Sequence, residues 1–135
     1  MVLEEHPDAF FERFAQVAFE TTILPSPYGY PLLELEIPGG LLPVFDQGPP
    51  PVETQTQRIL VHGVAREYRS ANEASYLHVF PGGHAKLSGF IQEALGDGFY
   101  HVASVIPVLV WVGAELEPGS RYVFDLAPPL LGYRP

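Results

Sequence analysis

The chain has 135 residues, of which 47% are hydrophobic, and a formal net charge of −9. This length and hydrophobic content fit one folded domain with its own core and exclude an intrinsically disordered chain. The chain contains no cysteine, which excludes disulfide scaffolds and metal sites built on thiolates.

The negative charge is concentrated at the start of the chain. Residues 1–53 hold nine acidic residues and one base, whereas residues 54–135 hold seven acidic residues and six bases. The first residues are acidic, unlike a signal peptide, and the longest apolar run, 102–114, is too short to span a bilayer. We therefore expect a cytoplasmic protein that does not enter a membrane. Its many Pro residues and its preference for Arg over Lys resemble a thermophile's composition.

The N-terminal part predicts a helix followed by a hairpin. Apolar residues fall on one helical face over residues 8–19, after Pro7, which suits a first helical turn. Residues 22–31 are rich in proline and predict a turn. Alternating apolar and acidic residues over 33–37 predict a strand with one wet face, and 41–45 predicts its return partner.

The proline-rich stretch 47–51 predicts a stiff spacer. It separates an acidic helix-plus-hairpin subelement, residues 1–46, from a β-rich core, residues 52–127. A Pro-rich tail, residues 128–135, completes the chain. Because about fifty residues rarely fold alone, we expect a single domain over residues 1–135.

The β-rich core predicts four strands and a helix. Strands are expected over 58–68 and 75–80, and Gly63 inside the first of these indicates a bulge or a close backbone approach. A long strand over 100–112, bent or interrupted at Pro107, is expected to form a hairpin with 121–126 through a tight turn at 117–120.

Residues 85–95 predict a second helix. Leu87, Phe90, Ile91, Ala94 and Leu95 recur at helical spacing, and Gly96 stands where a left-handed C-cap belongs.

These elements predict an α+β fold with a mostly antiparallel, strongly curved sheet and two covering helices. Counting 41–45 as a strand, the order is three strands, a helix and two strands. That order resembles the OB-fold, a small five-stranded barrel whose members often bind single-stranded nucleic acid or a partner protein. An open sheet is the alternative.

The OB-like order implies a nucleic-acid interface built from aromatic and arginine side chains. Aromatic rings stack on bases, and arginines follow the phosphates. The candidate residues are Arg58, Arg66, Arg69, Arg121, Tyr68, Tyr76 and Trp111.

His78 and His84 are candidate metal ligands because they flank the turn that precedes the predicted second helix. That glycine-led loop and helix resemble the Nudix hydrolases, which hold divalent cations with several helix glutamates. This segment offers only Glu93, so the Nudix resemblance is rejected. A small metal-dependent hydrolase using these two histidines and Glu93 remains the third hypothesis.

The sequence contains no nucleotide-binding loop and no nucleophile elbow. No cofactor is therefore expected, and catalysis is not the leading interpretation. The first hypothesis is a non-enzymatic protein-interaction or assembly module that binds another protein or a second copy of itself. The alternative is an OB-like protein that binds single-stranded nucleic acid.

Overall fold

The structure is a computed structural model, which describes residues 6–48 and 53–135. It is mostly β, with 56% of residues in strands and 8% in helices. The elements, in chain order, are α1 (Pro7–Arg13), a 3₁₀ turn (Ala15–Val17), β1 (Phe19–Pro25), β2 (Leu32–Ile37), β3 (Gly40–Asp46), β4 (Gln55–Ser70), β5 (Tyr76–Val79), β6 (Ala85–Gly96), β7 (Phe99–Ala103), β8 (Pro107–Trp111), β9 (Arg121–Leu126) and β10 (Leu131–Tyr133).

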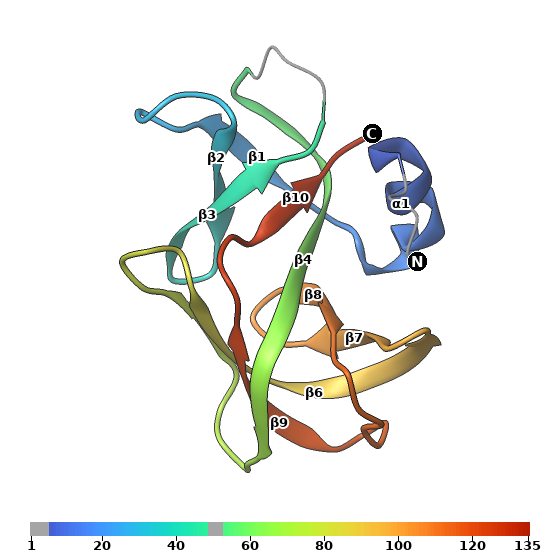
Figure 1. Ribbon diagram of the computed structural model, residues 1–135. Coiled ribbons are helices and arrows are strands. Elements are labelled where there is room, and N and C mark those ends of the chain that lie inside the picture. The colour runs from blue at the N-terminus through green and yellow to red at the C-terminus, as the bar shows by residue number, and fades with distance from the viewer. Residues whose placement is uncertain (1–5, 49–52) are drawn as a thin grey trace.

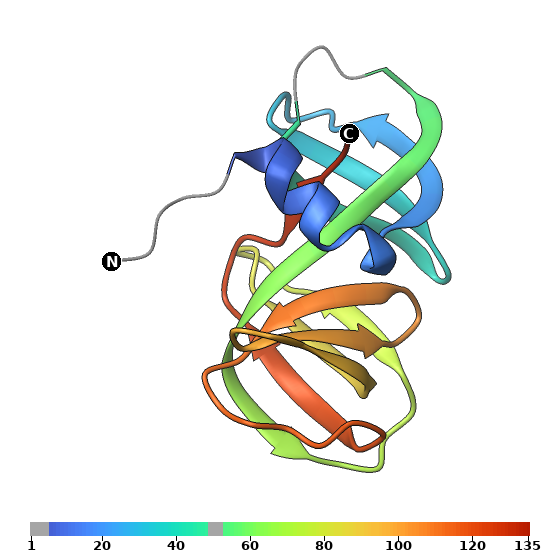
Figure 2. The same ribbon diagram turned by 90° about the vertical axis from the view of Figure 1, so that its right-hand side faces the viewer.

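The strand pairings form two closed rings of five strands that share β4. In the first ring, the N-terminal barrel, β1 pairs with β2, β2 with β3, β3 with β10, β10 with β4, and β4 with β1. In the second, the C-terminal barrel, β4 pairs with β8, β8 with β7, β7 with β6, β6 with β9, and β9 with β4. The long strand β4 runs through both barrels, which are stacked one above the other (Figures 1 and 2).

One hydrophobic core fills both barrels. In the N-terminal barrel the alternation of β2 and β3 turns Leu33, Leu35, Leu42 and Val44 inward, as a strand with one wet face requires. The cluster continues into the C-terminal barrel through residues such as Leu87, Val102, Val108 and Phe124. Because the buried residues form one connected cluster, the two barrels share a single interior.

The helix α1 lies outside the barrels, against β4 and β8 (Figure 2). Phe10, Phe14 and Val17 are buried there with Leu60 and Leu109. The predicted N-terminal helix is thus confirmed, although it ends at Arg13 and only the 3₁₀ turn continues it. Within the described residues, no helix has the length and hydropathy needed to cross a membrane.

The predicted second helix is wrong, and with it the α+β fold class. Residues 85–95 form strand β6, which pairs with β5 and β7 on one side and with β9 on the other. Since the OB-like order depended on a helix here, that resemblance fails too. What remains of the expectation is a strongly curved, closed sheet.

The segment 100–112 is interrupted just before Pro107, as the sequence allowed, but it is not one long strand, because the chain turns back after Ala103. β7 and β8 pair as an antiparallel hairpin, with Val102 opposite Val108. The predicted partner of β9 is wrong as well: β9 pairs with β4 and β6, not with β8. The turn before β9 is nevertheless present, with a backbone hydrogen bond from Ser120 to Glu117 and a left-handed Gly119.

Two strands were not expected at all. β1 takes up residues 22–25 of the proline-rich segment, ahead of a turn closed by a hydrogen bond from Gly29 to Ser26, and β10 lies in the proline-rich tail. The β2–β3 hairpin and the strands β4 and β5 are confirmed. At Gly63 the close neighbours are side chains and not backbone, since a Cβ there would lie 3.0 Å from the Leu126 side chain, and the register shift of β4 lies further on, between Ala65 and Glu67. Residues 49–52, most of the predicted spacer, lie outside the described residues.

Candidate functional site

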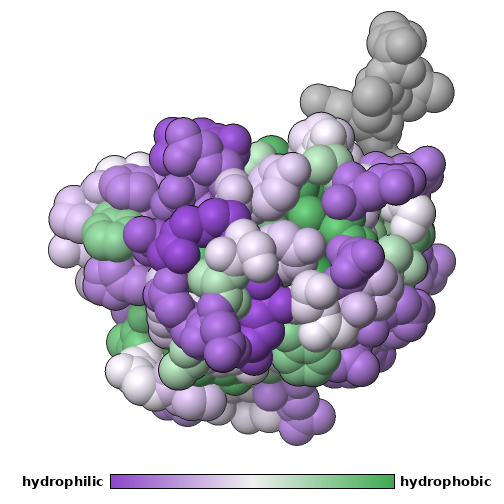
Figure 3. Space-filling view, turned by 90° about the horizontal axis from the view of Figure 1, so that it is seen from below, coloured by the Kyte–Doolittle hydropathy of each residue, from purple (hydrophilic) through white to green (hydrophobic). Residues whose placement is uncertain are grey.

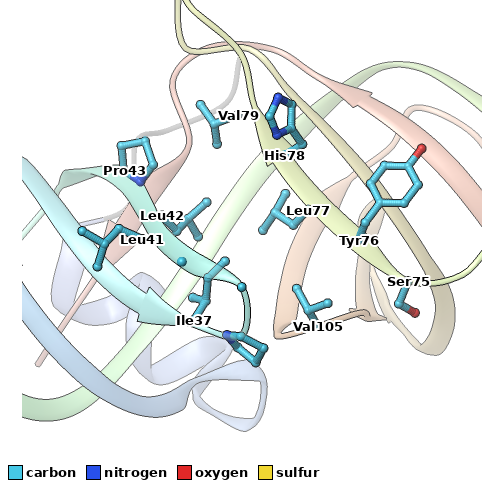
Figure 4. A pocket seen from close by; sticks show the side chains of 13 residues that line it. Ile37, Leu41, Leu42, Pro43, Ser75, Tyr76, Leu77, His78, Val79 and Val105 are labelled. Atoms are coloured by element: carbon cyan, nitrogen blue, oxygen red, sulfur yellow. The ribbon is translucent and has the colours of Figure 1, made fainter.

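A cleft of about 360 Å³ separates the β2–β3 hairpin of the N-terminal barrel from β5. Ile37 and Leu42 point into it from the hairpin, and Leu77 and Val79 point into it from β5 (Figure 4). Tyr76 points away from it. The cleft therefore has aliphatic walls supplied by two strands that are not hydrogen-bonded to each other.

Strand β5 has one side unpaired along its whole length. Among the described strands it is the one with a single partner, β6. The amide of Phe80 donates to the carbonyl of His84, 2.9 Å away, which fixes the register at the turn. Because hydrogen-bonded pairs alternate along an antiparallel ladder, Tyr76 and His78 direct their backbone groups toward β6. Leu77 and Val79 therefore direct theirs toward the cleft.

The opposite wall of the cleft is a second, partly unpaired edge. The amide of Phe45 donates to the carbonyl of Leu130, 2.8 Å away, so β3 is covered from Phe45 onward. By the same alternation, Pro43 and Leu41 direct their backbone groups outward. Pro43 has no N–H, which explains why it is tolerated here and leaves Leu41 as the donor on this edge.

The candidate nucleic-acid residues do not gather on one concave face. Arg69 and Arg121 instead hold the loop between β4 and β5. Arg69 pairs with the Glu73 carboxylate at 2.7 Å, and Arg121 donates to the Glu73 carbonyl at 3.0 Å and to Ser75 Oγ at 2.8 Å. Tyr76 donates to the same carboxylate at 3.4 Å, and burial together with this carboxylate raises the pKa of its phenol.

The other members of that set lie elsewhere. Arg58 donates to the carbonyl of Ala15 beneath α1, at 2.6 Å. Arg66 lies at an irregularity of β4, in a shallow depression with His84. Trp111 donates its indole N–H to the Asp97 carbonyl beside the β6–β7 turn. Tyr68, on the C-terminal part of β4, packs edge-on against Tyr122. Seen from below, where β4 ends, the molecule shows mainly hydrophilic residues with separate hydrophobic spots (Figure 3).

The two candidate metal ligands both contact the ring of Phe80. Phe80 stacks on His84 at 4.9 Å and meets His78 edge-on at 4.5 Å. Glu93 lies far along β6, where it accepts a hydrogen bond from Gln16. Glu93 follows His84 by nine residues, which corresponds to roughly 30 Å along an extended strand. Within residues 6–48 and 53–135, no three His, Cys, Asp or Glu side chains are grouped so that they could hold a metal.

His62 is the most deeply buried histidine described, and its environment is structural. Its Nδ1–H donates to the carbonyl of Leu109 at 2.8 Å, and its ring packs against Phe10 and Phe99. Burial lowers its pKa, which the hydrogen bond opposes only in part. A neutral imidazole held in this way fixes α1 to the barrels.

Of the residues that line the cleft, the sequence points to Tyr76 and His78, each for another kind of site, and to none of the aliphatic ones. The alternation of Leu77 and Val79 with Tyr76 and His78 was visible, and it correctly indicates a strand. Whether a strand edge is free, however, depends on which segments pair with it, and that is a property of the fold. Compared with protein families, with curated proteins and with solved structures, the chain matches none.

Proposed function

We propose that the protein is an interaction module that captures an extended segment of a partner protein along β5. The observation that carries this proposal is the unpaired edge formed by Leu77 and Val79, which faces an aliphatic cleft. An extended peptide adds to such an edge as a further strand: backbone hydrogen bonds supply affinity, and side-chain pockets supply specificity.

The cleft suits a strand better than a compact ligand. Most of its lining residues are aliphatic, and its titratable lining residues are His78 and Tyr76, of which Tyr76 points away from the cleft. Such walls hold few groups that could orient a polar small molecule or carry out a reaction. The backbone donors and acceptors of Leu77 and Val79, in contrast, are spaced as a neighbouring strand requires.

The test compares two substitutions at one position. Peptides are selected on the wild-type protein from a displayed library of random linear peptides, and their affinities are measured by calorimetry. Val79→Pro removes one of the two outward N–H groups of β5 without removing a β5–β6 hydrogen bond, and we expect it to weaken binding about tenfold or more, because a peptide carbonyl is left unpaired. Val79→Ala is the matched control, since it shortens the side chain but keeps the donor.

A thermal melt of each variant establishes that the fold is retained. As an independent measurement, amide exchange on the wild-type protein should show that a selected peptide protects Leu77 and Val79. The proposal is overturned if the library yields no binder, if the binders protect other amides, or if both substitutions weaken binding equally.

A further inference from the structure

The surface beside the cleft is acidic. Residues 19–46, which include all of β1, β2 and β3, contain no Lys, Arg or His. In the pairing register, Glu36 lies opposite Leu41 and Glu34 lies opposite Pro43, so these four side chains share the outer face of the β2–β3 hairpin. Leu41 is 53% exposed, and Leu41 and Pro43 both line the cleft.

The far side of the cleft carries charges of both signs. On the outer face of the C-terminal barrel, His78 lies opposite Lys86, and Lys86 lies opposite Asp125, which in turn lies opposite Glu67. The residues closest to the cleft on this side are thus a histidine and a lysine. The two walls therefore differ in charge: the β3 side carries acidic groups alone, whereas the row that starts at His78 on the β5 side carries one lysine and two acids.

We infer that the captured segment alternates apolar and basic residues. This inference rests on the proposed function. Side chains of the added strand that face inward enter the aliphatic cleft between Leu42 and Leu77. Side chains that face outward lie beside Leu41 and Pro43. Long Lys or Arg stems cover such apolar surface while their charged groups reach past it.

The geometry places Glu34 and Glu36 within reach of the charged ends of Lys or Arg side chains on the captured segment. A strand next to β3 is two strand spacings from β2, roughly 10 Å. A Lys or Arg side chain extended across Leu41 toward Glu36 covers most of that distance. A second copy of this chain is a poorer occupant, because each copy carries a net charge of −9 and like charges repel.

The probes are two synthetic peptides of equal length, alternating Lys-Val and alternating Glu-Val, titrated into the whole protein. At low salt we expect the Lys-Val peptide to bind about tenfold more tightly, from about 1.4 kcal/mol of difference in charge interactions. The preference should shrink at about 1 M salt, where the Debye length is about 3 Å.

The control variants separate local from general attraction. The double variant Glu34→Gln with Glu36→Gln should abolish the preference for the Lys-Val peptide. Both peptides should still bind through the valine side chains that enter the cleft. Glu115→Gln combined with Glu117→Gln makes the same change in net charge in the loop before β9 and should leave the preference unchanged.

The outcomes distinguish the two proposals. If both peptides protect Leu77 and Val79 with equal affinity, the basic segment is contradicted and strand addition stands. If both double variants reduce the preference equally, the attraction is general and the basic segment is again contradicted. If neither peptide binds, or if the protein dimerises through β5 instead, capture of a partner's segment fails together with its charge preference.

Discussion

Replacing Asp46 by alanine is expected to lower the free energy of unfolding by about 3–5 kcal/mol, because it breaks a buried ion pair that is joined by two hydrogen bonds. Arg134 donates to both carboxylate oxygens of Asp46, from Nε at 2.9 Å and from a terminal nitrogen at 2.6 Å. Asp46 is 4% exposed and Arg134 is 5% exposed. The pair joins the end of β3 to the residue that follows β10, so it holds the N-terminal barrel closed.

Urea denaturation of Asp46→Ala measures this effect. The companion is the double variant Asp46→Leu with Arg134→Met, which removes both charges and should recover much of the lost stability, as apolar replacements of buried ion pairs often do. A loss below about 1 kcal/mol, typical of an exposed pair, contradicts the burial of this ion pair.

Replacing Gly89 by alanine is expected to destabilise the protein by about 3 kcal/mol, the upper end of ordinary overpacking. A Cβ at this position of β6 would lie 2.5 Å from the Ala103 carbonyl oxygen, a backbone atom that cannot move aside as a side chain can. The sequence pattern predicts the opposite sign, because in a helix over 85–95 the same substitution would stabilise by about 1 kcal/mol.

Gly113→Ala serves as the control for Gly89→Ala. A Cβ at Gly113 makes an ordinary contact with the Trp111 ring, at 3.4 Å, and should change the stability little. Thermal and urea denaturation of both variants measure the change in stability and so distinguish a strand from a helix over residues 85–95. A stabilised Gly89→Ala protein would mean that residues 85–95 are helical.

The misreading of β6 has a physical cause. Ala85, Leu87 and Ile91 are buried at the even spacing of a strand. Register shifts after Ile91 and after Ala94 then break the alternation, and Leu95 packs against the α1 cluster outside the barrel. These irregularities put apolar residues at spacings of three and four, which is the helical signature. A bulge is set by its partner strands, and a single sequence does not show them.

The elements that the sequence predicts correctly are those whose hydrophobic pattern and turn residues lie within the element itself. The β2–β3 hairpin alternates cleanly and turns at Pro38 and Gly39, and α1 has an apolar face after a proline. β10 lacks such a signal, because it is three residues long and depends on pairing with β3 and β4. The Asp46–Arg134 pair, 88 residues apart in sequence, has no local signal either.

The candidate site follows from the closure of the two barrels. Closed rings leave few unpaired strand edges, and proteins usually cover or shorten those that remain. β5 is short, at four residues, and stands outside both rings. Its free side faces the cleft between the barrels, where an incoming strand would be shielded on both sides by aliphatic residues.

Amide hydrogen exchange at residues 76–79 of the unbound protein, followed by NMR, tests the central claim most directly. The free edge of β5 predicts alternation, with slow exchange at Tyr76 and His78, whose N–H groups are bonded to β6, and fast exchange at Leu77 and Val79. If Leu77 and Val79 exchange as slowly as their neighbours, the edge is already covered, and the protein has no strand edge to offer to a partner.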